Sequence, residues 1–480
     1  MSKNYHTLHN KKRAIKREIM KIKKTFISIL CVTLLTLSTF LGCGAKTKSI
    51  VSIEKTFTSG KVDTYTITYS DGSLYNFEIT NGTDGKDIDI YELYDAYLSF
   101  YPGANFEQFL KTLVDSEDII DLSVSNKALT QSLKVYSEFV ENYYIGWPYQ
   151  QVAKNRAIYC GSAVIYKIYD DYTYMITNYH VLYDVNAAST SKIADKIVCY
   201  LYGSESAPVA TTQTDESGTI YSYGDYGIDC EYVGGTITCD LAVIRAKTQD
   251  VFSINPNVTE ITFADSYTVG ETAIAIGNSE NEGISVTKGI VSVDNEYINY
   301  AIDNNIRSYR SMRIDTAIYG GNSGGGLFNK KGELIGITNA GDGTDQNINY
   351  AIPLNIVRPV IENIMFNKTL KTLALGVEVY GENSKYIYDE NLGFGKIYED
   401  VMIKSVTENS VAESLNLKAG DKLLSITINS TTYPLTRYFD LSDILYLVKP
   451  GDTISFEYQN ERTNKTANYL VLASDFVAVS

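Results

Sequence analysis

Histidine, tryptophan and proline are scarce in this chain. Its 480 residues include three His, one Trp, eight Pro and six Cys. No Cys belongs to a C-x-x-C pair or has a His nearby, so the spacings typical of zinc sites are absent from the sequence. We therefore expect neither a metal nor a cofactor.

Basic residues are scarce after the first 24 positions. The chain has a net charge of −15, yet residues 1–24 carry +8 and residues 25–42 carry no charge, so the rest carries −23. Nucleic-acid binding needs clustered Lys and Arg for phosphate contacts, so we expect no nucleic-acid partner. An acidic surface of this kind favours a well-solvated protein.

The chain is rich in residues that form strands. Hydrophobic residues make up 44% of it, which is enough for two to four domains, and 40 residues are Tyr. Many stretches alternate and contain Thr, Ile, Val and Tyr, which predicts a mainly β protein. Residues 63–82 alternate around Asp71-Gly72, a dipeptide typical of hairpin turns. Residues 89–123 change to helical spacing and predict a small helical region.

The amino-terminal segment has the layout of a secretory signal. From Met20 to Cys43 a basic start is followed by 18 uncharged residues and a small residue before the Cys. The ending "FLGC" resembles the lipobox of bacterial lipoproteins, which implies lipidation of Cys43. An uncleaved membrane helix is the alternative. Either way we expect the bulk of the chain outside the cytoplasm, and the start at Met1 or Met20 stays open.

One imidazole remains after such a signal is removed. His6 and His9 precede the signal core, which leaves His180, at the end of the apolar stretch "YMITNYHVL". It is the candidate general base. Asp240 begins the apolar stretch "DLAVI" and is the candidate to orient that imidazole. Asp225 and Asp229 are nearby alternatives in a Tyr/Gly-rich loop, which is a poorer place for rigid geometry.

Residues 320–328, "GGNSGGGLF", surround a single hydroxyl with glycines. A nucleophile in acyl transfer needs its hydroxyl near a base and needs backbone N–H groups directed at the developing oxyanion. Ser323 fits the first role, and the amides of Gly321 and Ser323 fit the second. A flexible loop is the alternative interpretation. The order His, Asp, Ser is that of chymotrypsin.

The motifs "TNYHV", "DLAVI", "GNSGGGL" and "NYAIP" together resemble, in order and spacing, the HtrA (Deg) family of trypsin-like serine proteases. The resemblance covers roughly residues 125–360 and implies two six-stranded β-barrels, a His180–Asp240–Ser323 triad in the cleft between them and, often, a homotrimer. It also implies that Ala317 helps to set a preference for small or medium apolar residues. The departures are Gly326 in place of the usual Pro and a long loop over residues 203–238.

The carboxy-terminal segment resembles a PDZ domain. Residues 401–430 suggest strand, short helix and strand, and we predict one helix in this segment. The resemblance implies that Leu375, Gly376 and Val377 form the loop that binds a peptide carboxylate.

These observations predict a membrane-tethered, extracytoplasmic serine endopeptidase that cleaves unfolded or extended polypeptides. The alternative is a catalytically silent scaffold that binds protein partners, and a chaperone role can coexist with proteolysis.

The four cysteines of the middle segment, Cys160, Cys199, Cys230 and Cys239, are either free or paired, with Cys230–Cys239 able to close a hairpin. The expected segments are a signal peptide (1–42), a tether with a β-hairpin (43–88), a helical region (89–123), a protease domain (124–366) and a PDZ domain (370–476).

Overall fold

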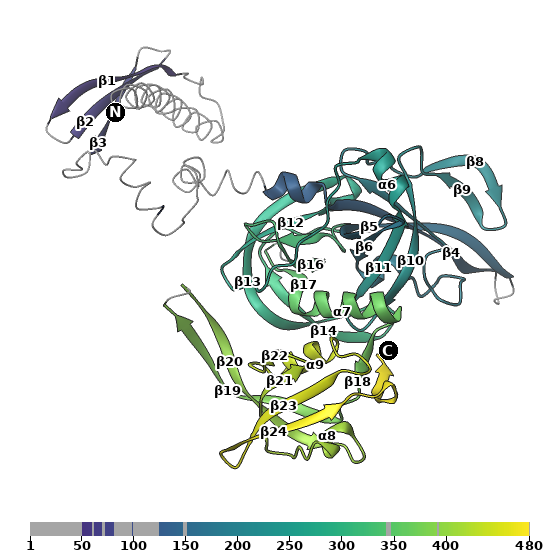
Figure 1. The fold of residues 1–480 in the computed structure, drawn as a ribbon. Helices are drawn as coiled ribbons and strands as arrows, with labels where there is room; N and C mark the ends of the chain where they lie inside the picture. Colours follow the sequence, from purple (N-terminus) through teal and green to yellow (C-terminus); the bar gives the residue numbers. More distant parts are fainter. Residues whose placement is uncertain are drawn as a thin grey trace, which may run out of the picture. The chain divides into compact units, whose positions relative to one another are not determined.

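The computed structural model describes residues 50–59, 62–69, 73–80, 98, 124–146, 151–341, 347–390 and 393–479. The chain divides into two compact units, Met1–Leu113 and Val114–Ser480 (Figure 1). The predicted signal segment with Cys43 lies outside the described residues, and so does the predicted helical region apart from Leu98, which is helical.

The first unit contains a three-stranded antiparallel sheet in the order β1-β2-β3. Its strands are β1 Ile50–Ser59, β2 Val62–Tyr69 and β3 Leu74–Thr80. The strands β2 and β3 are the two alternating stretches on either side of Asp71-Gly72, and Thr66 pairs with Asn76. Strand β1, which adds a third strand to the hairpin, was not predicted from the sequence.

In the second unit, the described residues start with a helical segment over residues 124–129, which is followed by a closed antiparallel barrel. The barrel strands are β4 Ser132–Ile145, β5 Gln151–Ile168, β6 Tyr172–Thr177, β7 Lys196–Leu201, β10 Ile228–Thr236 and β11 Leu241–Lys247. Alternate residues of these strands point inward. They form a core that includes Val135, Ile165, Met175, Cys199 and Ile244.

A second closed barrel follows in the chain. Its strands are β12 Thr272–Asn278, β13 Ile284–Ala301, β14 Ile306–Ile314, β15 Gly326–Phe328, β16 Leu334–Gly341 and β17 Asn349–Pro353. A shared apolar cluster joins the barrels, with Val164 and Ile176 from the first and Ile276 and Phe328 from the second. The predictions of a mainly β chain and of two six-stranded barrels are confirmed.

Helix α7, Leu354–Asn367, was not predicted from the sequence. It contacts β10 and β11 of the first barrel, β16 and β17 of the second, and α9 in the carboxy-terminal region (Figure 1). Its buried residues include Val357, Val360, Ile361 and Ile364, which follow helical spacing and form one apolar face. The helix ends at Asn367, and the next residue, Lys368, caps it with a left-handed φ of 68°.

Residues 203–238, which were predicted to be a long loop, contain regular strands. They contain the hairpin β8 Val209–Asp215 and β9 Gly218–Ser222, and they include β10. The guanidinium of Arg156 holds the hairpin through hydrogen bonds of 2.7 and 2.6 Å to the Asp215 carboxylate. Asp229, an alternative to Asp240 in the sequence, lies on β10 and pairs with Val198 on β7, and its side chain is 81% exposed.

The carboxy-terminal region is a mixed arrangement of one sheet and short helices. The sheet strands are β19 Val377–Asp389, β20 Phe394–Val406, β21 Lys422–Ile428, β22 Thr431–Pro434, β23 Thr453–Asn460 and β24 Thr463–Leu470. A separate pair joins β18 Lys371–Leu373 to β25 Phe476–Ala478. Two α-helices, α8 Val411–Ser414 and α9 Asp440–Leu445, replace the single helix predicted.

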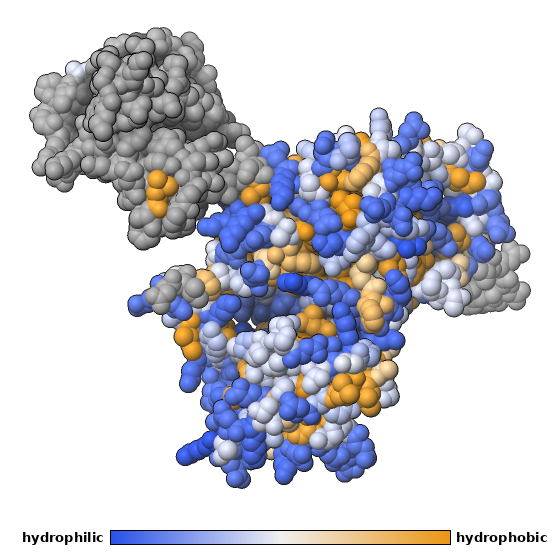
Figure 2. Space-filling view, viewed as in Figure 1, coloured by the Kyte–Doolittle hydropathy of each residue, from blue (hydrophilic) through white to orange (hydrophobic). Residues whose placement is uncertain are grey.

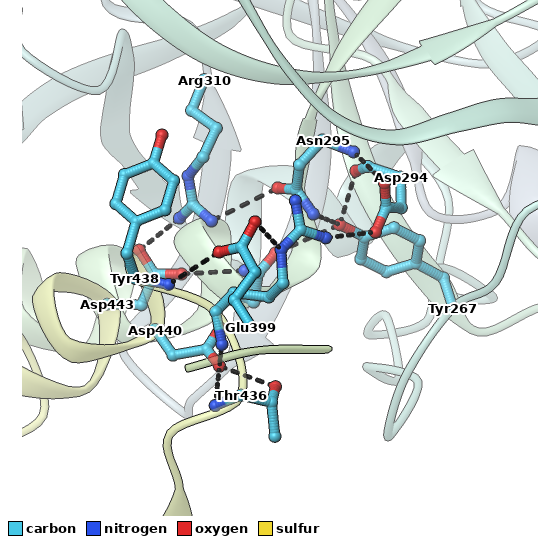
Figure 3. A network of polar contacts seen from close by, with 11 residues as sticks. Tyr267, Asp294, Asn295, Arg310, Glu399, Thr436, Tyr438, Asp440 and Asp443 are labelled. Carbon is cyan, nitrogen blue, oxygen red and sulfur yellow. Dashed lines mark hydrogen bonds and ion pairs between the residues drawn. The ribbon is translucent and has the colours of Figure 1, made fainter. Parts of the chain in front are cut away.

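The carboxy-terminal region contacts the second barrel through buried charges. Arg310 on β14 bonds to the carboxylate of Asp443 on α9, and Asn355 on α7 donates to the same carboxylate at 2.8 Å. Arg437 is close to Asp294 on β13, at 3.1 Å, and to Glu399 on β20, at 3.3 Å. Figure 3 shows this network spanning the interface. Beside it lies a cleft of about 980 Å³, visible as the hollow between the second barrel and the carboxy-terminal sheet (Figure 2).

The four cysteines of the second unit, Cys160, Cys199, Cys230 and Cys239, are all free. Cys230 therefore does not pair with Cys239 across the β10–β11 hairpin. In the described part of the chain, no helix is both long enough and apolar enough to cross a membrane. The same residues contain no group of three or more His, Cys, Asp or Glu arranged to hold a metal ion.

Candidate active site

His180 lies just after the end of strand β6 of the first barrel. The strand ends at Thr177, and His180 is in the short helix α5, Tyr179–Leu182. Val181 and Leu182 are buried in the barrel core, which anchors the helix while the imidazole stays 30% exposed. Local sequence thus places an accessible imidazole on a firmly packed turn.

Asp240 precedes β11 and is completely buried. Its φ of 51° is left-handed, which is strained for a residue with a Cβ and is typical of functional sites. The backbone carbonyl of Asp240 accepts hydrogen bonds from Tyr179 N at 3.2 Å and from Asn178 Nδ2 at 2.9 Å. These bonds join the end of β6 to the start of β11 and bring Asp240 beside His180.

The carboxylate of Asp240 bonds twice to His180. Oδ2 lies 2.7 Å from Nδ1 of the imidazole, and Oδ1 accepts from the backbone amide at 2.9 Å. The buried carboxylate favours the tautomer with its proton on Nδ1, which leaves Nε2 free to accept a proton. Burial lowers the pKa of His180, but the charge and hydrogen bond of Asp240 outweigh it, so the pKa is raised overall.

Two residues that were not predicted from the sequence, Tyr300 and Asn339, join His180 and Asp240 in one hydrogen-bonded cluster. Tyr300 on β13 donates its hydroxyl proton to Oδ2 of Asp240 at 3.1 Å. Asn339 on β16 donates from Nδ2 to the Tyr300 oxygen at 2.7 Å. No local motif marks either residue, because strand register in the second barrel brings Tyr300 to Asp240 and Asn339 to Tyr300.

Ser323 is held by backbone contacts between the two barrels. Its carbonyl accepts from Ser162 N on β5 at 2.8 Å, and Gly324 N donates to Thr338 O on β16 at 2.9 Å. A Cβ at Gly324 would lie 2.3 Å from Thr177 Oγ1 and 3.1 Å from Asn178 N. Only glycine permits this approach, which brings the Ser323 loop to the end of β6 just before His180.

The hydroxyl of Ser323 donates to the carbonyl oxygen of Asn339 at 2.9 Å. Within the described residues it makes no hydrogen bond to His180. The structure therefore brings His180 and Asp240 into direct contact and places Ser323 in the adjoining loop, with its hydroxyl turned toward β16.

The amides of Gly321 and Ser323 are unbonded among the described residues, whereas Asn322, Gly324 and Gly325 each donate to a backbone carbonyl. Gly321 has a left-handed φ of 94°, and a Cβ there would lie 2.2 Å from Asn278 O. The loop thus presents two free N–H groups next to the Ser323 hydroxyl. Free amides of this kind can stabilise an oxyanion.

The remaining predicted site residues lie in two other places. Ala317 is half-buried, and its carbonyl accepts from Thr287 Oγ1 on β13 at 2.9 Å. Leu375 is buried, Gly376 has a φ of 81°, and Val377 begins β19. The carbonyls of Leu375 and Gly376 accept from Ala412 N and Thr407 N, so this turn is fixed against α8 and the end of β20.

Comparison with known proteins points to one family. The trypsin-like peptidase domain matches residues 161–337. The serine protease Do-like HtrB of Bacillus subtilis is 29% identical over 323 residues, covering 64% of this chain and 61% of the relative. HtrA of the same organism is 31% identical over 305 residues, covering 61% and 59%. HtrA of Lactococcus lactis subsp. cremoris is 28% identical over 322 residues, covering 64% and 69%.

The chain thus spans about three fifths of the length of the Bacillus relatives that it matches. Among solved structures, the HtrA-type protease AlgW with a decapeptide is 22% identical with a TM-score of 0.44, covering 73% of this chain and 98% of that one. Together, the two barrels, the domain match and the curated relatives show that the chain contains a trypsin-like peptidase domain and is similar to HtrA/Deg serine proteases.

Proposed function

We propose that this chain is a serine endopeptidase that cleaves unfolded or extended polypeptides. Ser323 is the nucleophile, His180 the general base and acid, and Asp240 the residue that orients His180. The amides of Gly321 and Ser323 stabilise the oxyanion. The observation that carries the proposal is the buried Asp240 carboxylate 2.7 Å from Nδ1 of His180, beside a loop that offers a hydroxyl and two free amides.

The chemistry follows from these positions. The Ser323 hydroxyl leaves the Asn339 carbonyl and turns to Nε2 of His180, which takes its proton as the oxygen attacks the peptide carbonyl. The negative charge that develops on that carbonyl oxygen is stabilised by the two free amides. His180 then donates its proton to the leaving amine, and water hydrolyses the acyl-enzyme by the same route. Ala317 contributes to a small apolar specificity pocket.

Labelling with a fluorophosphonate probe tests the nucleophile. The unmutated protein is expected to label and to cleave an unfolded polypeptide, because both reactions need an activated Ser323. Ser323→Ala removes the attacking oxygen and should abolish both, with an unchanged melting temperature as the control for folding. Absence of labelling in the unmutated protein, with peptide ligands present or absent, would favour the catalytically silent scaffold.

We further propose that the carboxy-terminal region is a PDZ domain that binds peptide ends. In support, β19 pairs only with β20 among the described strands, so its other edge is open to an added strand. Leu375, Gly376 and Val377 form the turn at the start of that edge. Fluorescence anisotropy with peptides that have free or amidated carboxyl ends tests this function, and equal affinity for both would contradict carboxylate binding.

The location and assembly of the protein belong to the same proposal. Cys43 carries a lipid that tethers the chain to the outer face of the cell membrane, and the molecule assembles as a homotrimer. The layout of residues 20–43 supports the tether. Metabolic labelling with a fatty acid, compared with Cys43→Ala, tests the lipid, and sedimentation of the protein in detergent tests the trimer.

A further inference from the structure

Tyr300 supplies a third hydrogen bond to the Asp240 carboxylate. Oδ1 accepts from the amide of His180, and Oδ2 accepts from both His180 Nδ1 and the Tyr300 hydroxyl. A fully buried carboxylate depends on such donors to remain charged. Building on the proposed function, we propose that Tyr300 is a positioning residue for catalysis, which holds Asp240 in the orientation that His180 requires.

The direction of the Tyr300 hydroxyl is set by Asn339. Asn339 Nδ2 donates to the phenol oxygen at 2.7 Å, and an amide nitrogen can only donate. The phenol proton therefore points to its other neighbour, Oδ2 of Asp240, 3.1 Å away. The backbone carbonyl of Asn339 meanwhile accepts from the Ser323 hydroxyl, so one residue contacts both Tyr300 and Ser323.

The ring of Tyr300 is held by the long hairpin of β13 and β14. It stacks on Tyr309, with ring centroids 4.0 Å apart and an angle of 19° between the planes. Tyr300 pairs with Arg307, and Ile298 pairs with Tyr309, so the two rings are diagonal neighbours on one face of the hairpin. Arg310, the next residue, points to the opposite face and binds Asp443. The hairpin therefore has one face on the catalytic cluster and the other on the carboxy-terminal region.

Tyr300 acts through hydrogen bonding and transfers no proton. Burial and the charge of Asp240 raise the pKa of its phenol, so the hydroxyl stays protonated at neutral pH. Its bond draws part of the carboxylate charge away from His180 while fixing the oxygen that His180 contacts. Removal of the hydroxyl should therefore loosen the carboxylate and raise the pKa of His180.

Tyr300→Phe and Tyr309→Phe form a matched pair for testing this role. Both keep the stacked rings, but the Tyr309 hydroxyl is buried without a hydrogen-bond partner among the described residues. We expect Tyr300→Phe to lower kcat/KM about tenfold through kcat, the scale on which a hydrogen bond to a charged group acts. The acid limb of the pH profile should move to higher pH. Tyr309→Phe should change neither quantity.

A second readout does not depend on activity. The chain has three His, and the signal of His180 is identified by its loss in His180→Gln. In the full chain carrying Ser323→Ala, nuclear magnetic resonance titration should show a higher His180 pKa with Tyr300→Phe than without it. In an Asp240→Asn background, Tyr300→Phe should change kcat/KM less than about twofold, because coupled residues are not additive.

An unchanged rate and an unchanged His180 pKa in Tyr300→Phe would overturn the proposal. If that variant does not fold, Asn339→Ala removes the donor that orients the hydroxyl, and unchanged values for it would overturn the proposal equally. If the unmutated protein labels with no fluorophosphonate, the proposed function fails. The titration then still decides whether Tyr300 acts on Asp240.

Discussion

His180 and Asp240 are 60 residues apart in the chain, yet two bonds from His180 to the Asp240 carboxylate hold them together. Two further bonds, from Tyr179 N and Asn178 Nδ2 to the Asp240 carbonyl, fix the segment before His180. At the scale of single residues, the site depends on where side chains are absent as much as where they are present. Glycine at 324 lets the Ser323 loop touch the end of β6, and glycine at 321 lets the chain pass Asn278. The free amides of the loop follow from that path.

Gly321→Ala tests the role of this path. The new Cβ would lie 2.2 Å from Asn278 O at a left-handed φ, so the peptide has to shift. We expect kcat to fall by about 100- to 1000-fold, as for the loss of one oxyanion donor. Gly320→Ala is the matched control, because a Cβ there meets no atom within 4 Å. Steady-state kinetics of both variants measure the effect, and full activity in Gly321→Ala would argue against this amide.

At the scale of elements, the resemblance to the HtrA family implied the two barrels, whereas α7 was not predicted. Motifs such as "GNSGGGL" and "DLAVI" combine a turn with a buried strand, so they define local structure and chain order together. The residues of α7 directly follow the strand motif "NYAIP", and their apolar side chains have helical spacing in the sequence. This spacing did not predict a helix, because Pro359 lies within it and a polar stretch follows it. The hairpin β8–β9 was missed because β8 is mostly exposed, β9 is mostly half-buried, and neither strand shows a clear alternation.

The turn before β19 offers a test of how α8 is fixed. Gly376→Ala would place a Cβ 2.3 Å from Ser410 Cβ, whereas Gly420→Ala, at a similar φ, meets nothing within 4 Å. We expect the second change to cost about 1–2 kcal/mol from backbone strain alone and the first to cost more, because α8 has to move. Hydrogen exchange across residues 401–428 measures the difference, and equal protection in the two variants would refute it.

At the scale of the whole second unit, the carboxy-terminal region is joined to the second barrel by buried charge. Arg310 is 6% exposed and Asp443 is 9% exposed, and the guanidinium also lies 4.1 Å from the centre of the Phe439 ring. Burial raises the pKa of Asp443 to about 7, although Arg310 and Asn355 oppose the shift. The folded chain therefore takes up a proton at this site as pH falls below about 7, and its stability decreases as pH rises through that range.

Arg310→Met removes the cation and leaves Asp443 buried. Breaking a buried pair on one side typically costs about 3–5 kcal/mol. The lost cation also raises the Asp443 pKa further, so we expect a larger cost near about pH 8 than near about pH 5. The cost is measured at both pH values by denaturation of the unmutated protein and of Arg310→Met, monitored by hydrogen exchange at the interface.

Two controls accompany this variant. Arg310→Met/Asp443→Leu removes both charges and should recover most of the loss. Lys404→Met breaks the exposed pair with Glu378 and should change little, because both side chains are more than half exposed. A loss in Arg310→Met that does not vary with pH would show that Asp443 does not titrate at this interface.

The sequence by itself determined the β character of the chain and the glycine loop, because both depend on residues that are neighbours in the chain. It also determined the order of His180, Asp240 and Ser323, which can be read directly from the chain. The tertiary structure alone decided that Tyr300 and Asn339 complete the cluster around Asp240 and that Arg310 binds Asp443. Those contacts depend on the register of β13 with β14 and on the packing of α9. Strand register arises from burial summed over whole faces, so no short motif records it.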